Sequence, residues 1–126
     1  MVSTEVAQIS GECQAWRNNL RSFKEEFSTL KNRLQHLAKG QTHRETLLEI
    51  EHLENQFHIQ QINIHDLKQA VKKHLREAEE METGNQKQYS SELLSRHEQL
   101  FEEYQSLESM VSELRGEFEE FEKHIR

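Results

Sequence analysis

"KGQTHRETLLEIEHLENQF", residues 39–57, is the stretch that decides whether the chain folds back on itself or continues as one long rod. Gly40 follows an apolar repeat, where glycine adopts the left-handed conformation that ends a helix at little cost. Thr42 matches an N-cap, and Glu45, three residues later, completes a capping box. Because a stop signal is followed directly by a start signal, we expect two helices joined by a short turn, which makes them antiparallel.

On both sides of this stretch, apolar residues recur at alternating spacings of four and three, which places them on one face of a helix. We call these positions the seam. In the first segment the seam comprises Val2, Val6, Ile9, Cys13, Trp16, Leu20, Phe23, Phe27, Leu30, Leu34 and Leu37. In the second it comprises Ile50, Leu53, Phe57, Gln60, Ile64, Leu67, Val71, His74, Ala78 and Met81. In the third it comprises Leu93, His97, Leu100, Tyr104, Leu107, Val111, Leu114, Phe118, Phe121 and Ile125.

A second break, at Thr83, Gly84 and Asn85, separates the second segment from the third, with Ser90 or Ser91 as the next N-cap. The 126 residues include no proline and four glycines, and 31% are charged, a composition that favours helices. The sequence therefore predicts an all-α fold, an antiparallel three-helix bundle with left-handed coiled-coil packing.

We expect a single domain over residues 1–126, with helices over about residues 2–39, 43–82 and 87–126. Because the seam reaches both ends of the sequence, we expect this domain to be part of a longer tandem or coiled-coil protein.

Short turns also set the register between neighbouring helices. We expect Phe27 to lie beside Phe57 and Val111, and Trp16 to lie level with Leu67 and Leu100. The residues expected to pack in the core or to fix its register are Trp16, Phe27, Phe57, Gln60, Leu67, His74, His97, Leu100 and Val111. Each helix faces two neighbours, so the apolar residues that flank the seam are also expected to be buried, the alternative being a partner groove. They are Leu48, Ile62, Leu75, Phe101 and Met110.

The alternative to the bundle is an extended helix that dimerises along its whole length. Continuing the spacing beyond Leu37 would place Gln41, Arg44 and Leu48 in the seam, and two of these three are polar. A rod would also gain nothing from a glycine and a capping box at the same place. We favour the bundle and keep as the alternative a homodimeric coiled-coil adaptor that binds cargo or a small GTPase.

The tryptophan in Cys13-Gln14-Ala15-Trp16, on the seam of the first helix, resembles the first-helix aromatic residue of the spectrin repeat family. The stretch "SELLSRHEQLFEEYQSLESMVSEL", residues 91–114, resembles the leucine-rich third helix of such a repeat. The resemblance covers the whole chain and implies that Trp16 packs in the middle of a three-helix bundle. The chain departs from the family pattern in its greater length and in the polar seam residues Gln60 and His74.

Chemistry-bearing residues are few. The expected register brings Cys13, His74 and His97 into neighbouring layers, but the sequence contains no CxxC or HExxH spacing, and the surrounding seam is apolar. We therefore expect these residues to be polar core positions that fix register, and we expect no catalytic residues, no metal and no cofactor.

The charged residues suggest surfaces for binding partners more than a catalytic site. Lys68, Lys72, Lys73 and Arg76, which we call the basic patch, share one face of the second helix and could dock on an acidic lipid or filament surface. The alternative is that they are solvated and bridge to glutamates of the third helix. An acidic run that includes Glu122 is expected to meet Arg33 or Arg44 at the other end.

The net charge of −7 argues against binding to nucleic acid, and no apolar run is long enough to span a membrane. One cysteine and an amino terminus without a signal-peptide profile favour the cytoplasm, with association with the cytoskeleton allowed. We expect a monomeric, non-enzymatic module of an intracellular scaffold or cytoskeletal protein, with protein partners.

Overall fold

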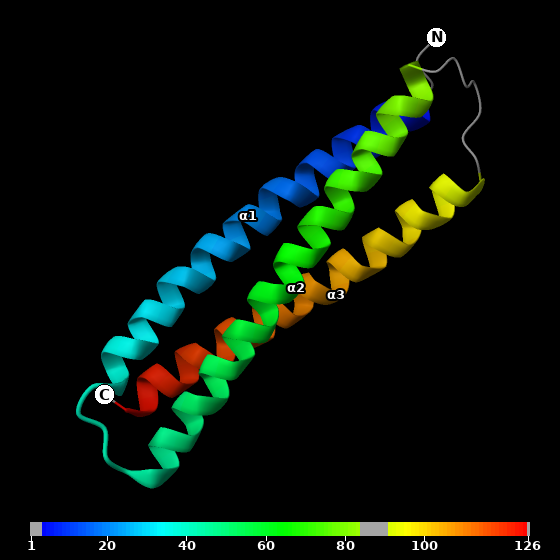
Figure 1. Cartoon of the computed structure of the whole chain (residues 1–126). Coiled ribbons are helices and arrows are strands. Elements are labelled where there is room, and N and C mark those ends of the chain that lie inside the picture. Colours follow the sequence, from blue (N-terminus) through cyan, green and yellow to red (C-terminus); the bar gives the residue numbers. More distant parts are fainter. Residues whose placement is uncertain (1–3, 84–90, 126) are drawn as a thin grey trace.

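The computed structural model describes residues 4–83 and 91–125, which form three long helices and contain no strand (Figure 1). The helices are α1 (Thr4–Ala38), α2 (Arg44–Thr83) and α3 (Ser91–His124). Each helix contacts the other two, α2 runs antiparallel to both, and α1 and α3 are therefore parallel. The predicted all-α three-helix bundle is confirmed, and each described helix end lies within about four residues of its expected place.

The turn between α1 and α2 has the predicted glycine geometry. Gly40 has a φ of 81°, a conformation that residues with a side chain rarely adopt. The backbone N–H of Lys39 donates to the carbonyl of His36 at 3.3 Å, and that of Gln41 donates to Ala38 at 3.2 Å, which satisfies carbonyls at the end of α1. The chain folds back here, so it does not form the extended rod.

The start of α2 differs from the expectation by one residue. The backbone N–H of Leu47 donates to the carbonyl of His43 at 3.0 Å, so His43 occupies the N-cap position that was expected for Thr42. Glu45 then lies in the first turn of α2, where its negative charge interacts favourably with the helix dipole.

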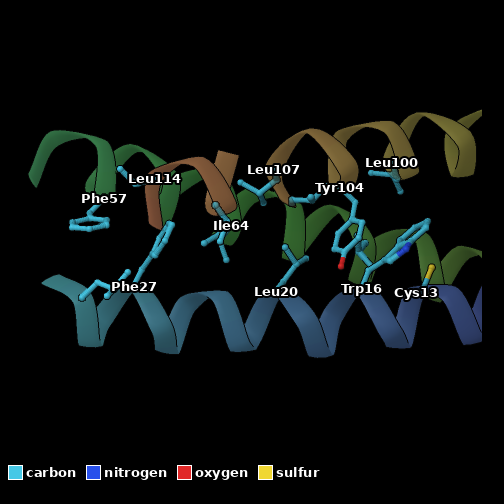
Figure 2. Packing of buried hydrophobic residues seen from close by; sticks show 14 of the residues in the cluster. Cys13, Trp16, Leu20, Phe27, Phe57, Ile64, Leu100, Tyr104, Leu107 and Leu114 are labelled. Carbon is cyan, nitrogen blue, oxygen red and sulfur yellow. The ribbon is translucent and has the colours of Figure 1, made fainter. Parts of the chain in front are cut away.

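The seam forms the hydrophobic core. Among the residues whose burial is described, every seam position is buried or partly buried, and Leu75 is the one buried residue that lies outside the seam. Figure 2 shows this packing from Cys13 at one end to Phe27 and Phe57 at the other. The expected seam position Val2 and the expected breaks and caps at Gly84, Asn85 and Ser90 lie outside the described residues, and Val6 lies within α1.

The expectation that the flanking apolar residues are buried was wrong for four of the five. The side chains of Leu48, Ile62, Phe101 and Met110 are between 39% and 55% exposed, and Leu75 alone is buried. The apolar stripe of each helix is therefore narrower than predicted, since the seam residues already fill the space between the three helices.

The register between α1 and α2 is as predicted, and α3 has nearly its expected register beside Trp16, which stacks on residues on both sides of Leu100, but is displaced at the Gly40 end. The rings of Phe27 and Phe57 lie 5.4 Å apart, as expected. On α3, however, Phe57 contacts the ring of Phe118, at 5.9 Å, seven residues beyond the expected Val111. Pairs between α1 and α3 show where the displacement occurs: Glu12 pairs with a residue 85 positions away and Glu26 with one 89 positions away, whereas Trp16 level with Leu100 implies 84.

Ion pairs clamp α1 to α3 near the Gly40 end. The guanidinium group of Arg115 donates to both carboxylate oxygens of Glu26, at 2.5 and 2.7 Å, and this pairing raises the pKa of Arg115. Arg33 pairs with Glu122, as the sequence predicted, and its guanidinium carbon lies 5.2 Å from the centre of the Phe118 ring. Charge and aromatic packing therefore act together at this end.

Candidate functional site

A polar cluster interrupts the core at the end of the bundle away from Gly40. Each helix contributes one residue to it: Cys13 on α1, His74 on α2 and His97 on α3. The thiol sulfur and one ring nitrogen of each histidine all lie within 4.8 Å of one another. Cys13 and His74 have no exposed surface, and the side chain of His97 is 13% exposed. The structure thus brings together the three residues that the expected register placed in neighbouring layers.

A chain of hydrogen bonds crosses the cluster. Nε2 of His97 lies 2.7 Å from Oε2 of Glu12, and Nδ1 of His97 lies 3.0 Å from Nε2 of His74. A carboxylate can only accept, so Nε2–H of His97 donates to Glu12, and with Nε2–H of His74 as the donor to Nδ1 of His97 the chain of hydrogen bonds is complete. His74 then carries its proton on Nε2, and its Nδ1 is an unprotonated acceptor. This atom is buried without a hydrogen-bond partner.

Burial sets the protonation states of the cluster. Burial, followed by the electrostatic effect of the neighbouring His97, lowers the pKa of His74 to about 4, so its imidazole is neutral at pH 7. Burial, followed by the nearby Glu12 carboxylate, raises the pKa of the Cys13 thiol to about 12. The hydrogen bonds from His97 and Gln8 lower the pKa of Glu12. A neutral thiol that is buried and protonated is a poor nucleophile, which argues against thiol catalysis here.

Trp16 holds the histidine pair in place. Its ring stacks on His97 with centroids 4.9 Å apart, and His97 stacks on His74 at 5.1 Å. The same indole stacks on Phe101 at 5.9 Å and on Tyr104 at 5.8 Å. The ring of His97 therefore lies between two flat neighbours, which restricts its rotation and fixes the direction of both ring nitrogens.

A surface groove leads to this cluster from solvent. Ile9, Glu12 and Trp16 of α1 line one side, and Leu94, His97 and Phe101 of α3 line the other. Towards its N-terminus α3 diverges from the other two helices in Figure 1. The groove gives small solutes a path to His97, while Cys13 and His74 stay behind it in the core.

The remaining register residues are core residues. Phe27 and Phe57 are fully buried, and Leu67, Leu100 and Val111 are buried with them. Gln60 is also buried, and its side-chain oxygen accepts a hydrogen bond from Nδ2 of Asn63 at 3.3 Å. That Gln60 and His74 specify the register stays a prediction.

The basic patch lies on the outer face of α2. Lys72, Lys73 and Arg76 are exposed, and Lys68 is partly exposed. Within residues 4–83 and 91–125, none of these four cations forms an ion pair, so the expected bridges to glutamates of α3 are not formed. The patch therefore presents unneutralised positive charge on a chain of net charge −7.

The sequence did not single out Glu12, Asn19 or Tyr104 as members of this region. Nδ2 of Asn19 donates to the Tyr104 hydroxyl at 2.7 Å, and that hydroxyl donates to Glu108 at 3.3 Å. Glu12 and Asn19 each pair with a residue 85 positions away. The expected register, in which Trp16 is level with Leu100, comes within one residue of both pairs, but the residue types alone give no signal.

Comparison with known proteins adds no relative. We found no matching family model, no matching curated protein and no matching solved structure. Among the helices of residues 4–83 and 91–125, none has an apolar stretch long enough for a membrane crossing.

Proposed function

We propose that the chain is a non-enzymatic structural and protein-interaction module, a spectrin-like repeat of an intracellular scaffold or cytoskeleton-associated protein. The observation that carries the proposal is the continuous core, in which the seam of all three helices is used for packing along its length. Such a bundle is a stiff spacer about 50 to 60 Å long, from the usual rise of about 1.5 Å per residue. Its outer faces are left for recognition.

The position of Trp16 supports the spectrin-like reading. The indole is buried within the bundle, as the resemblance implies for the first-helix aromatic residue of a spectrin repeat, and it also contacts the ring of Tyr104 on α3. The parallel arrangement of α1 and α3 also supports a tandem array, since the third helix of one repeat then points towards the first helix of the next.

The basic patch is the docking surface that we assign to this module, and an acidic protein filament is its partner. Four cations on one helix face attract such a surface, because none of them is neutralised by a neighbouring glutamate among the described residues. Attraction of this kind is screened by salt, so binding is expected to weaken as the ionic strength rises.

The test is cosedimentation of the purified chain with actin filaments, used as an acidic probe, at low and physiological salt. Charge reversal by Lys72→Glu and Lys73→Glu is expected to reduce binding at least tenfold, because it adds repulsion as well as removing attraction. The control is Lys24→Glu, which reverses an exposed charge on α1. Absence of binding at low salt, or equal losses in the patch and control variants, would contradict the proposed docking surface.

A further inference from the structure

The polar cluster has the composition and the spacing of a metal site. It combines one thiol and two imidazoles, ligand types that zinc prefers, and the three donor atoms lie within 4.8 Å of one another. Bond lengths of about 2.3 Å to sulfur and about 2.0 to 2.1 Å to nitrogen place ligand atoms of a tetrahedral zinc site roughly 3.3 to 3.6 Å apart. Side-chain movements of about 1 Å would therefore close the cluster around an ion.

One ring nitrogen of the buried histidine pair has no hydrogen-bond partner. His74 has no exposed surface, and its Nδ1 has no hydrogen-bond partner. A buried polar atom without a partner costs about 1 to 3 kcal/mol, so such atoms are rare in folded proteins and call for an explanation. A metal ion bound through Nδ1 would satisfy this atom, whereas an ion bound through Nε2 would leave it without a partner.

The surroundings of His97 match those of a metal-bound histidine. Such a histidine usually donates its second ring N–H to a carboxylate, which fixes the tautomer and directs the other nitrogen to the metal. His97 makes this contact with Glu12 through Nε2, so its Nδ1 faces the cluster. Nε2 of Gln8 in turn donates to Oε1 of Glu12 at 2.9 Å and holds that carboxylate in place.

We propose that Cys13, His74 and His97 bind one zinc ion between the three helices, with a water molecule from the groove in the fourth position. The ion replaces the hydrogen bond between the two imidazoles and binds Nδ1 of His97, a ring nitrogen of His74 and the sulfur of Cys13. Glu12 acts on the ion through His97.

Charge balance favours a divalent cation. The thiol is protonated at pH 7, so zinc binding forms the sulfur–zinc bond and releases the thiol proton to solvent, one proton for each ion. The imidazole of His74 is neutral at pH 7 and loses no net proton. The thiolate and Glu12 then offset the two positive charges, and the carboxylate of Glu79 also acts electrostatically on Cys13.

Zinc at this position would cross-link the bundle. Since each ligand comes from a different helix, the ion ties α3 to α1 and α2 at the end where α3 diverges in Figure 1. Binding to the folded chain alone raises its stability by mass action, and a hundredfold excess over Kd corresponds to a rise in Tm of roughly 10 °C for a chain of this size.

The experiment is a titration of the untagged, reduced chain with cobalt, a spectroscopic substitute for zinc, followed by displacement with zinc. We expect one ion per chain, a thiolate-to-cobalt charge-transfer band, loss of that band when zinc is added, and one proton released per ion. Cobalt binding without the charge-transfer band would mean that the ion sits on surface histidines, and this result would overturn the proposal. So would the absence of stoichiometric binding.

Variants identify the ligands. Cys13→Ala is expected to abolish the charge-transfer band, and His97→Gln to weaken zinc binding at least a hundredfold. Glu12→Gln is expected to retain the band and weaken binding about 10- to 100-fold, because it removes only the carboxylate behind His97. His58→Gln removes an exposed histidine of α2 and is the control that keeps full binding. Equal binding in Cys13→Ala and in the unmodified chain would refute the site.

X-ray absorption at the zinc edge identifies the ligand atoms in the unmodified chain. It therefore tests the proposed site even if a substitution prevents folding. The expected shell has one sulfur at about 2.3 Å and two imidazole nitrogens at about 2.0 to 2.1 Å. A shell of nitrogen and oxygen alone would exclude Cys13 as a ligand and with it the proposed site.

Discussion

The two ends of this bundle are built on the same seam but are stabilised in different ways. At the Gly40 end, the rings of Phe27, Phe57 and Phe118 pack against one another, and the ion pair of Arg115 with Glu26 clamps α1 to α3. At the other end, a thiol and two histidines occupy equivalent seam positions, and one buried nitrogen has no partner.

This difference teaches that a regular heptad pattern does not imply uniform stability. Burial of apolar rings stabilises the fold by itself. A buried polar network stabilises it only when every polar group in it has a hydrogen-bond partner. We therefore expect the Phe27 end to provide most of the global stability and the polar end to open locally first. Local opening at the polar end would give a ligand access to a site that is otherwise buried.

The largest expected effect comes from deleting a ring at the aromatic end. Phe57→Ala is expected to lower the free energy of unfolding by about 3 to 5 kcal/mol, because Phe57 is fully buried and contacts aromatic rings on both neighbouring helices. The measurement is urea unfolding followed by circular dichroism. Phe101→Ala, which truncates a 43% exposed ring, is the matched control and should cost much less.

His74→Leu tests the same comparison at the polar end. It is expected to change the free energy of unfolding of the metal-free chain by less than about 1 kcal/mol, because it removes one unsatisfied nitrogen and leaves another on His97. A loss as large as that of Phe57→Ala would mean that both ends contribute equally, and the proposed difference between them would be wrong.

The fold was largely predictable from the sequence because the seam spacing and the break and cap residues indicated the same three helices. Seam spacing alone identified every described buried residue except Leu75, since in a narrow bundle only the seam faces both neighbours. The glycine at position 40 was readable because few residues adopt a φ of 81°.

The details that sequence reasoning missed depend on distances between helices. The register of α3 was nearly right beside Trp16 but wrong at the Gly40 end, where Glu26 pairs with a residue 89 positions away instead of 84, since turn positions do not specify how one helix inclines to another. The exposure of Phe101 depends on how far apart α1 and α3 lie, which no local pattern specifies. Glu12 joined the polar cluster through a partner 85 residues away, so its role needed the three-dimensional register.

An effect smaller than that of Phe57→Ala is a dependence of stability on pH that originates at the polar end. The pKa of His74 is lowered from 6.5 to about 4 in the folded chain, so between these values the unfolded chain binds more protons. Stability is therefore retained above pH 6.5 and falls as the pH decreases towards 4, by about 2 to 3 kcal/mol in total.

Urea unfolding of the metal-free chain at pH 7, 5.5 and 4.5 measures this decrease, and His74→Gln is expected to remove most of it. The lowered pKa of Glu12 adds a further loss of stability, but mainly below its ordinary value of 4.5. If the unmodified chain and His74→Gln lost stability in parallel between pH 7 and 5, the buried imidazole would not be the source.

The smallest expected effect concerns the clamp at the aromatic end. Glu26→Gln is expected to lower the free energy of unfolding by about 0.5 to 1 kcal/mol, because the pair with Arg115 is bidentate but about one third exposed. Salt should reduce the difference between the variant and the unmodified chain, since mobile ions screen an exposed pair.

A double-mutant cycle that combines Glu26→Gln with Arg115→Gln isolates the pairwise free energy from other effects of either substitution. A coupling near zero would show that the aromatic rings alone hold this end together. A coupling above about 2 kcal/mol would instead mean that charge contributes as much as a buried ring. In that case the contrast between the two ends would lie in whether polar groups are fully paired, as they are for Arg115, or left incomplete, as they are for His74.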